Sequence, residues 1–600
     1  MSRLKTLVLL LFSCTYLFSE DLENYEVITV VSSIPKASNE IIIAVDKINR
    51  DFLDKTQPKD LSSLLRENLA IDVSSNGGMG QLSSTFLRGS NSNHTLVKVN
   101  GIKINPSTAG GASIYNLDSD LISNIEIGYG PLSAVHGSTA LGGVIDISTR
   151  SQIQRSNSSV GFSIGPDSFG KELIRFNQQF TESSFLNIGL SRTNTDGYPV
   201  LTSSTLDRGY ENTTIIGNLE VNSKFGNFEL SSWSANGTVE YLVFGSPVSQ
   251  EYENYAYGLE NSNHVEGILS YKINITTSKD LIEQNNPNFL GQLDLTNTKR
   301  DSLELIVSEM QIFNNPEDFV LGAHIEDEAV DYSSYGTLYE EKITTKSFFG
   351  SSSLSFLNTD INTSFRNSDH EIYKSNLSWN FEILKDLNES WRIGISSGSS
   401  FRSPVSSELF GFGGNVNLEP EINRSREINL KRTLQNADLS LLIFRSNFTN
   451  LINFDYQDYV LKNINKASNK GLEVRYKLQK EDWDLLMIAK TQDPKDETGN
   501  QLLRRSKKSA SLTLSRELNG FIATANLSYF GERVDFGGIN LPSFNLVNIA
   551  LTKDFNKKFN LSLKLENIMD KDYFTAATSN DFYANQGRSA WLKINYELGE

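Results

Sequence analysis

The sequence predicts an all-β transmembrane protein, an antiparallel outer-membrane barrel of about 22 strands that encloses an N-terminal α+β plug domain. Three observations support this fold class. The chain opens with a short apolar leader, continues with a glycine-punctuated stretch from Leu61 to Arg150, and then alternates between apolar and polar residues through residues 151–600. Because a barrel of this size is too wide to be filled by its own side chains, the glycine-rich module is the expected stopper.

Residues 1–19 have the features of a secretory signal peptide. A basic start precedes the apolar run Leu7–Phe12, and polar residues follow from Glu20. The run is too short to remain as a membrane anchor, so we expect export and cleavage just before Glu20. Cys14, the only cysteine, leaves open a lipoprotein-type cleavage that would lipidate it. Cleavage before Glu20 would leave a chain without disulfides.

The charge balance excludes one large class of partner. The chain has 55 Lys and Arg against 72 Asp and Glu, a net charge of −17, whereas nucleic-acid binding draws most of its affinity from a basic face. Hydrophobic residues make up 38% of the chain, and beyond the leader no apolar run approaches the ~20 residues of a membrane helix. A transmembrane barrel is compatible with this composition because alternation disperses its apolar residues.

The alternation has a period of two over many segments. Every second position from Phe559 to Leu565 is apolar, and the same holds from Ala590 to Leu598 and from Phe521 to Tyr529. Such strands present one face to lipid and the other to a polar lumen. A large soluble β-solenoid or sandwich also alternates, but the signal peptide, the aromatic residues at strand ends and the unbroken length favour the membrane.

Length sets the number of strands. A tilted membrane strand with its connection takes roughly 20 residues, so residues 151–600 accommodate about 22 strands. Short turns such as 554–558 are expected on the periplasmic side, and the polar stretches 199–210, 250–263 and 455–470 as external loops. The predicted organisation is a signal peptide (1–19), an N-terminal segment and linker (20–40), a plug domain (41–150) and a barrel (151–600).

Four segments carry a resemblance to a known family. They are Asn76–Ser84 with the following Phe86–Gly89, the glycine-rich Ile125–Thr149, the mid-barrel stretch Phe401–Glu421, and Glu566–Tyr573 near the end of the chain. On these motifs the chain resembles the TonB-dependent outer-membrane receptors, and Asn76–Ser84 is most similar to the family's cobalamin (vitamin B12) importers. The resemblance covers nearly the whole chain and implies a plugged barrel.

The chain departs from the family pattern at three places. Tyr129 stands where the family usually has an arginine, and His136 where it usually has a tyrosine. The chain ends in Leu598-Gly599-Glu600 rather than on an aromatic residue. These changes bear on how the plug and barrel pair and assemble, not on the architecture.

The resemblance implies a TonB box near the N-terminus. It falls on Val27, Ile28, Thr29, Val30, Val31 and Ser32. A β-branched, extended segment is suited to adding as a strand to a partner's sheet, and an energy-transducing TonB protein is the expected partner because the chain has no Walker-type phosphate loop. The alternative is that this segment is only the first strand of the plug.

The ligand site is expected on plug loops that reach the outer face. Residues 76–82 and 105–116 are glycine-rich, which allows tight turns and close approach of backbone amides to a ligand. The resemblance carries corrinoid binding onto Asn76, Gly78, Met79, Gln81, Leu82, Thr108 and Ser113. The alternative for each glycine is that it only permits a tight turn and does not contact the ligand. Arg88 is expected to form a buried pair with a barrel carboxylate rather than to meet ligand.

Calcium is the candidate ion, although no cofactor is expected to be required. The resemblance places Asp196 and Asp207 in the region where the cobalamin importers bind calcium, and calcium takes six or more oxygen ligands. A solvated acidic loop is the alternative. The five histidines are scattered, so no zinc motif is predicted, and His94 and His136 are expected to be structural. No Gly-x-Ser-x-Gly elbow is present, so no enzyme is predicted.

The predicted function is TonB-dependent import of a scarce nutrient across the outer membrane, with cobalamin or a related corrinoid preferred. A ferric siderophore is the alternative cargo, and heme is disfavoured because no histidine lies near residues 401–417 in the sequence. A passive pore or an adhesin is the third possibility. We expect a monomer in outer-membrane lipid, with TonB and a nutrient ligand as partners and no nucleic acid.

Overall fold

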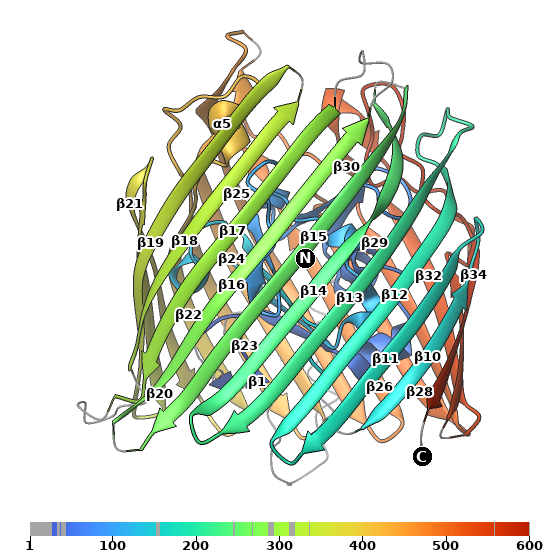
Figure 1. Cartoon of the computed structure of the whole chain (residues 1–600), viewed down its shortest axis with the longest axis horizontal. Helices are drawn as coiled ribbons and strands as arrows, with labels where there is room; N and C mark the ends of the chain where they lie inside the picture. Colours follow the sequence, from blue (N-terminus) through green and yellow to red (C-terminus); the bar gives the residue numbers. More distant parts are fainter. Residues whose placement is uncertain are drawn as a thin grey trace, which may run out of the picture.

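The computed structural model describes residues 27–32, 36–37, 44–151, 156–243, 246–266, 268–285, 293–310, 319–334, 336–455, 457–556 and 558–598. Within these residues the predicted fold is confirmed, because 22 long antiparallel strands close into a barrel around the N-terminal domain (Figure 1). None of the described helices is long and apolar enough to cross a membrane. The predicted signal peptide, including Cys14, lies outside the described residues.

The long barrel strands are β10 (Asn157–Ile164), β11 (Gly170–Thr181), β12 (Ser184–Pro199), β13 (Asp207–Ser223), β14 (Gly226–Val243), β15 (Ser246–Val265), β16 (Leu269–Asn285), β17 (Leu293–Ser308), β18 (Phe319–Ser334), β19 (Thr337–Phe356), β20 (Thr359–His370), β21 (Lys374–Asp386), β22 (Trp391–Arg402), β23 (Glu421–Leu434), β24 (Ala437–Asp455), β25 (Val460–Lys480), β26 (Trp483–Gln492), β28 (Lys508–Leu518), β29 (Phe521–Phe530), β32 (Phe544–Asp554), β33 (Phe559–Glu566) and β34 (Ser589–Leu598). The connections at the outer mouth carry the short elements β27 (Lys495–Asp496), β30 (Arg533–Val534), β31 (Asn540–Leu541), α5 (Ser406–Phe410) and η7 (Phe536–Gly538).

The period-two pattern positions the side chains as predicted. On β33, Ser562, Lys564 and Glu566 are buried toward the lumen, whereas the intervening leucines face outward. Strand β34 pairs with β33 on one side and with β10 on the other, where Val160 lies opposite Tyr596, so the sheet has no free edge. An outer apolar surface over a closed ladder satisfies the backbone inside lipid.

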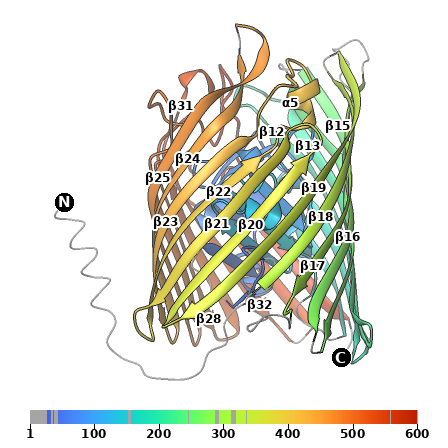
Figure 2. The same cartoon turned by 90° about the vertical axis from the view of Figure 1, so that its left-hand side faces the viewer.

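The two ends of the barrel differ. One end has short turns such as 224–225, 357–358 and 519–520, and the other carries the longer loops with α5 (Figures 1 and 2). Exposed aromatic residues, including Phe225 and Phe356, gather near the short turns, as expected of an interfacial girdle. The end with α5 is therefore the outer mouth.

Two of the predicted external loops are wrong. Residues 250–263 lie within β15, and most of 455–470 lies within β25. The third predicted loop, 199–210, does contain a connection, between the end of β12 at Pro199 and the start of β13 at Asp207. Strands β15 and β25 have 20 and 21 residues, whereas crossing a bilayer takes only ~9–11. Residues 250–263 run along β15 as far as Ser262, which pairs with Asn227 beside the short turn 224–225, and residues 460–470 form the outer half of β25. Both polar stretches are therefore part of the hydrogen-bonded ladder, so polarity did not indicate a loop.

The plug contains a five-stranded sheet with short helical elements. Its order is β3-β8-β9-β6-β7, with β6 and β9 parallel and the other pairs antiparallel. Its elements are β3 (Val45–Asn49), α2 (Arg50–Thr56), α3 (Leu61–Ser63), η2 (Leu64–Asn68), β4 (Asp72–Ser75), β5 (Ser83–Phe86), η3 (Ser92–His94), β6 (Thr95–Val99), β7 (Ile102–Lys103), η4 (Ile114–Asn116), η5 (Ser119–Leu121), β8 (Asn124–Tyr129), α4 (Ser133–His136) and β9 (Gly143–Ser148). The N-terminal strands β1 (Val27–Ile28) and β2 (Lys36–Ala37) form a separate pair.

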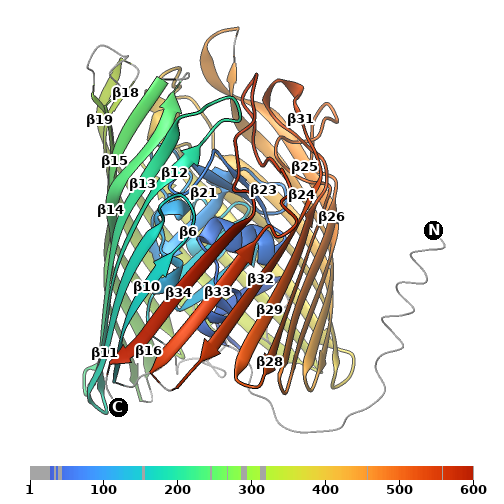
Figure 3. The same ribbon diagram turned by 90° about the vertical axis from the view of Figure 1, so that its right-hand side faces the viewer.

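The plug core is continuous with the barrel wall. Ile48, Ile125 and Ile145 of the plug sheet belong to one buried cluster together with Leu442 and Phe444 of β24. The views from both sides show the plug inside the lumen (Figures 2 and 3). The barrel and the plug therefore share apolar surface that neither could bury alone.

Candidate ligand site and coupling segment

The first plug loop, residues 76–82, folds tightly against barrel strand β13. The Asn76 amide donates to the Leu82 carbonyl at 3.0 Å, and Gly80 adopts a φ of +72°. A Cβ at Gly80 would lie 2.1 Å from the ring of Tyr210, so glycine is required on both counts. Leu82, at the base of the loop next to β5, is left 55% exposed.

The predicted ligand residues of this loop fall into two groups. Gly78 and Met79 are half-buried, and Met79 packs against the cluster of Tyr210 and Tyr252. Gln81 is only 4% exposed, and its side-chain amide donates to the Glu240 carbonyl at 2.6 Å. In this arrangement Leu82, Gly78 and Met79 offer surface to a ligand, whereas Gln81 anchors the loop to β14.

The second plug loop, residues 105–116, is tied to strands β16 and β17 and to α5. The Ser107 amide donates to the Thr298 hydroxyl at 3.1 Å, and the Ser407 hydroxyl donates to the Thr108 carbonyl. The hydroxyl of Ser113 is buried and donates to Asp280 at 3.3 Å. Thr108 remains half-buried whereas Ser113 is buried, so of the two residues predicted here Thr108 is the more accessible to a ligand.

An aromatic group at the outer mouth was not predicted from the sequence. Phe412 stacks on Phe454 with ring centroids 6.1 Å apart, and Tyr459 contacts the same ring edge-on at 6.3 Å. Phe412 is 62% and Tyr459 67% exposed. Exposed, mutually supported rings suit a large planar or aromatic ligand. The run Phe410 to Gly414, with alternating aromatics and glycines, was the available signal.

The N-terminal segment predicted as a TonB box is docked on the plug. The Thr29 amide and hydroxyl and the Val30 amide all donate to one carboxylate oxygen of Glu126, at 2.7, 3.0 and 3.0 Å. His136 donates through Nε2 to the Val30 carbonyl at 2.7 Å. Ile28 and Val30 are 3% and 0% exposed. The segment thus pairs its backbone with plug side chains and with β2 rather than with the five-stranded sheet.

Arg88 forms the buried ion pairs that were predicted for it. Its guanidinium lies 2.7 Å from Glu427 and 3.2 Å from Glu473, on β23 and β25. Arg475 of β25 lies 2.6 Å from Glu473 and 3.1 Å from Asp46 of β3. Five charged side chains therefore join the plug to the barrel.

Tyr129 occupies the centre of this cluster. The guanidinium carbons of Arg88 and Arg475 lie 5.0 and 4.8 Å from its ring centroid, and its hydroxyl donates to Asp46 at 2.5 Å. Burial raises the pKa of Tyr129 well above its usual value, so the hydroxyl keeps its proton. Two arginines, one from the plug and one from the barrel, therefore flank the ring of Tyr129.

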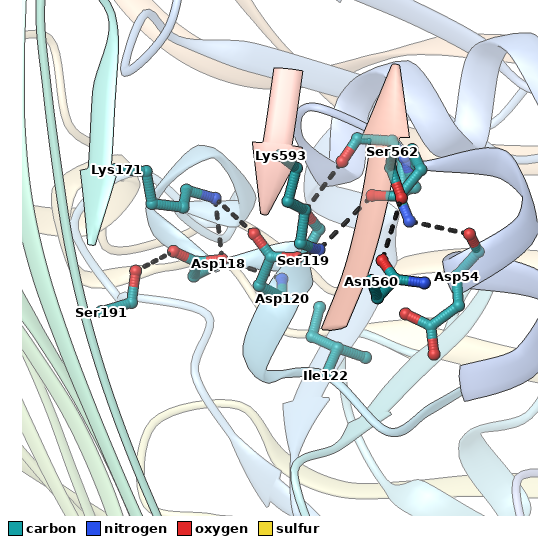
Figure 4. Close-up of polar contacts among 12 residues, drawn as sticks. Asp54, Asp118, Ser119, Asp120, Ile122, Lys171, Ser191, Asn560, Ser562 and Lys593 are labelled. Atoms are coloured by element: carbon teal, nitrogen blue, oxygen red, sulfur yellow. Dashed lines mark hydrogen bonds and ion pairs between the residues drawn. The ribbon is translucent and has the colours of Figure 1, made fainter. Parts of the chain in front are cut away.

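A second polar cluster ties the plug to both sides of the barrel seam (Figure 4). Lys171 of β11 lies 3.0 Å from both Asp118 and Asp120, and Lys593 of β34 pairs with Asp120. Burial alone would raise the pKa of Asp120, but Lys593, Lys171 and Arg50 outweigh it and hold that pKa well below its usual range. The plug therefore bridges strands next to the point where the barrel closes.

The two plug histidines have structural partners. His94 donates through Nε2 to Glu421 at 2.9 Å, accepts at Nδ1 from the Asn91 amide at 3.1 Å, and stacks on Phe448. Burial, the largest cause, lowers its pKa against the opposing pull of Glu421, so the ring stays neutral. This agrees with the structural role predicted for it.

The predicted calcium residues lie on the two neighbouring strands of one hairpin. Asp207 pairs with Pro199 at the outer end of β12 and β13, and Asp196 lies on β12 with its amide bonded to the Asp167 carbonyl at 3.0 Å. The part of the chain that the structure describes has no group of three or more His, Cys, Asp or Glu side chains placed to hold a metal ion. Calcium binding by Asp196 and Asp207 stays a prediction.

A closed 22-stranded barrel filled by an α+β plug, with glycine-rich loops at the outer mouth and an extended segment docked below, defines a gated outer-membrane receptor. Two family models match the chain. One, described as TonB-dependent receptor-like β-barrel, matches residues 143–568, and the other, the TonB-dependent receptor plug domain, matches residues 37–144. The chain therefore belongs to the TonB-dependent receptors, outer-membrane proteins that bind a nutrient ligand and interact with TonB.

The curated relatives and the solved structures that resemble this chain are named for different cargoes. The vitamin B12 transporter BtuB of Vibrio vulnificus (strain YJ016) is 25% identical over 623 residues, covering 98% of each chain. BtuB of Photobacterium profundum is 24% identical over 607 residues, covering 97% of each. The siderophore receptor PirA from Acinetobacter baumannii superposes with a TM-score of 0.78 at 17% identity, covering 93% of this chain and 98% of PirA. The ferric-catecholate import receptor Fiu from E. coli K12 has a TM-score of 0.77 at 11% identity, covering 94% and 98%. These two structures share the fold alone.

Proposed function

We propose that this receptor imports cobalamin or a related corrinoid across the outer membrane in a TonB-dependent manner. One observation carries the proposal: the similarity to vitamin B12 transporters extends over 98% of both chains. The loop Asn76–Ser84, whose sequence resembles that of cobalamin importers, lies on the outer face of the plug with Leu82 exposed. A loop that presents apolar surface beside backbone amides suits a large ligand with a mixed periphery.

In this proposal the ligand rests on the two plug loops, and energy arrives from the other side. The floor of the proposed ligand site is formed by Gly78, Met79, Leu82 and Thr108. The segment Val27–Ser32 is the handle, because its extended, β-branched backbone can add as a strand to TonB once it leaves Glu126. The receptor binds the ligand and provides its route through the barrel, and TonB provides the energy for transport.

A ferric siderophore is the second candidate cargo. The exposed aromatic group around Phe412 and Tyr459 favours it, because aromatic rings at the mouth suit catecholate-type ligands as well as a corrin. Heme also stays in the comparison, because His370 stacks on Tyr373 and the Tyr373 hydroxyl donates to the Pro404 carbonyl at 3.2 Å. A histidine that is distant from residues 401–417 in sequence is therefore close to them in space.

A direct titration decides between the cargoes. Purified receptor in detergent is titrated with cyanocobalamin, with a ferric catecholate siderophore and with hemin, and binding is followed by tryptophan fluorescence and calorimetry. The proposal predicts saturable binding of cyanocobalamin in preference to the other two. Saturable siderophore or hemin binding without corrinoid binding would refute the cargo and leave the fold unchanged.

A further inference from the structure

Four cations form a patch on the outer surface of the barrel wall. They are Arg424 and Arg426 of β23, Arg445 of β24 and Lys470 of β25, on three neighbouring strands (Figure 2). All four side chains are exposed, whereas Ser425, between the two arginines of β23, is buried toward the lumen. The patch therefore faces the membrane side of the wall and not the interior.

The patch lies where the apolar band of this wall ends. On the same outward face, the next positions toward the short turns are Ile428, Ile443 and Leu472, and all three are exposed. Arg445 is the ninth residue of β24, counted from the short-turn end at Ala437, and a membrane strand takes ~9–11 residues. The cations thus lie at the outer boundary of the hydrocarbon, where a lipid-facing charge costs far less than at the midplane.

The register of the three strands places like charges directly opposite one another. Arg426 lies opposite Arg445, and Arg445 lies opposite Lys470. Directly opposite residues on one face of an antiparallel pair have Cβ atoms ~4.5–5.5 Å apart, and like charges at this spacing destabilise the sheet. A row of three cations is therefore unfavourable unless an anion lies against it.

The described part of the chain supplies no such anion, because none of its carboxylates lies within ion-pair distance of the four cations. The Asp493 amide donates to the Lys470 carbonyl at 2.9 Å, but the Asp493 carboxylate pairs with Lys495, also at 2.9 Å. The neighbours of the patch on the adjoining strands are uncharged hydrogen-bonding side chains: Ser397, Ser399, Asn447 and Ser468.

Outward cations elsewhere on the barrel are paired. Lys279 of β16, Lys299 of β17 and Lys342 of β19 each lie within ion-pair distance of a carboxylate, at 2.7, 3.5 and 3.3 Å. A chain with a net charge of −17 has carboxylates available for this purpose. The patch on β23 to β25 is therefore complementary to an anion from outside the chain.

We propose that the patch binds the phosphate groups of a lipid in the outer leaflet. A guanidinium group binds phosphate oxygens through two parallel hydrogen bonds, and the adjoining serine and asparagine side chains can donate to further oxygens. Arg426 and Lys470 lie two strands apart, about 10 Å, a distance that a headgroup with two phosphates can span. The acyl chains of the same lipid lie along Ile428, Ile443 and Leu472. This site is independent of the imported cargo.

The same strands hold the plug from the inside. Glu427, next to Arg426 in β23, and Glu473 of β25 point into the lumen and pair with Arg88. A lipid bound across β23, β24 and β25 therefore fixes, from the membrane side, the part of the wall to which the plug is clamped.

Binding of diphosphoryl lipid A, a lipid with two phosphates, tests the proposal. Purified full-length receptor is washed free of lipid in a non-ionic detergent, and the bound probe is counted by native mass spectrometry. The Arg426→Gln/Arg445→Gln variant removes the centre of the patch. The Lys299→Gln/Lys342→Gln variant is the matched control, because it removes two exposed outward cations that already have carboxylate partners.

We expect one probe lipid per wild-type receptor, a roughly tenfold or greater loss of affinity in the arginine variant, because hydrogen bonds to charged groups are lost with each guanidinium, and no change in the control. An excess of inorganic pyrophosphate should not displace the lipid, since the acyl chains also contact the wall. Unchanged binding in the arginine variant, or equal loss in both variants, would overturn the site. Displacement by pyrophosphate would show a site for a soluble anion and overturn the lipid.

Thermal unfolding gives a second readout. Without lipid, replacement of two directly opposed arginines relieves like-charge repulsion, so the Arg426→Gln/Arg445→Gln variant should melt no lower than the wild type. With diphosphoryl lipid A, the wild type should melt higher than without it, and the variant should not shift. A variant that melts lower without lipid, or that shifts as much as the wild type with it, would refute the proposal.

Discussion

Replacement of Arg88 by glutamine tests how the plug is seated in the barrel. Arg88, Glu427 and Glu473 have side chains that are 2%, 5% and 3% exposed. In the Arg88→Gln variant Glu473 keeps Arg475 at 2.6 Å, whereas Arg88 is the only cation within ion-pair distance of Glu427 among the described residues. Stranding a buried charge in this way costs about 3 to 5 kcal/mol.

The cost should be recovered in part by neutralising the stranded carboxylate. Glu427→Gln in the Arg88→Gln background replaces the ion pair by two amides of similar shape, so the double variant should be more stable than the sum of the single variants predicts, with a coupling of about 0.5 to 3 kcal/mol. Calorimetry of purified receptor in detergent measures this, because a plug of ~100 residues shifts its melting temperature by roughly 4–8 °C per kcal/mol. The barrel transition is the internal control.

Two outcomes would refute this reasoning. The first is an Arg88→Gln variant whose plug transition coincides with that of the wild type. The second is additivity of the two substitutions, which would mean that Arg88 and Glu427 do not interact in the folded receptor.

Three further predictions concern the loops and the N-terminal segment. Deletion of Val27–Ser32 should abolish uptake while ligand affinity is retained; intact uptake in cells would contradict energisation through this segment. Gly80→Ala should weaken ligand binding and loosen the first loop, since the added Cβ would lie 2.1 Å from a barrel tyrosine; an unchanged dissociation constant in the titration would contradict this. Burial first, then Lys98 and Arg366, lower the pKa of His136 well below its usual 6.5. Docking of the segment should therefore be fully stable above pH 6.5 and be lost as pH falls further, which the mobility of a spin label within it would report; a pH-independent spectrum would contradict it.

Local features of the sequence were sufficient to predict the architecture. Alternation between Phe559 and Leu565 is set by lipid on one side and a polar lumen on the other, and no distant residue is needed to interpret it. The pairing of Arg88 followed from the same kind of reasoning, because a guanidinium within a plug strand needs a carboxylate. The sequence did not predict which barrel carboxylates, Glu427 and Glu473, pair with Arg88.

Features that depend on distant strands were not predictable. Gln81 and Ser113 were expected to bind ligand, and the structure gives both side chains barrel partners, Glu240 and Asp280. Which barrel strand faces which plug loop is set by closure of the whole sheet, not by the loop's own residues. The same applies to the aromatic group at the mouth, whose rings come from α5, β24 and their loops.

The origin of Arg475 in the barrel makes plug and barrel a matched pair. A plug from a relative that carries an arginine at the position of Tyr129 would bring a third guanidinium against Arg88 and Arg475, and would lose the hydroxyl that donates to Asp46. Such a plug should therefore fit this barrel only if the residue at position 475 is changed with it, so the plug and strand β25 form one matched unit.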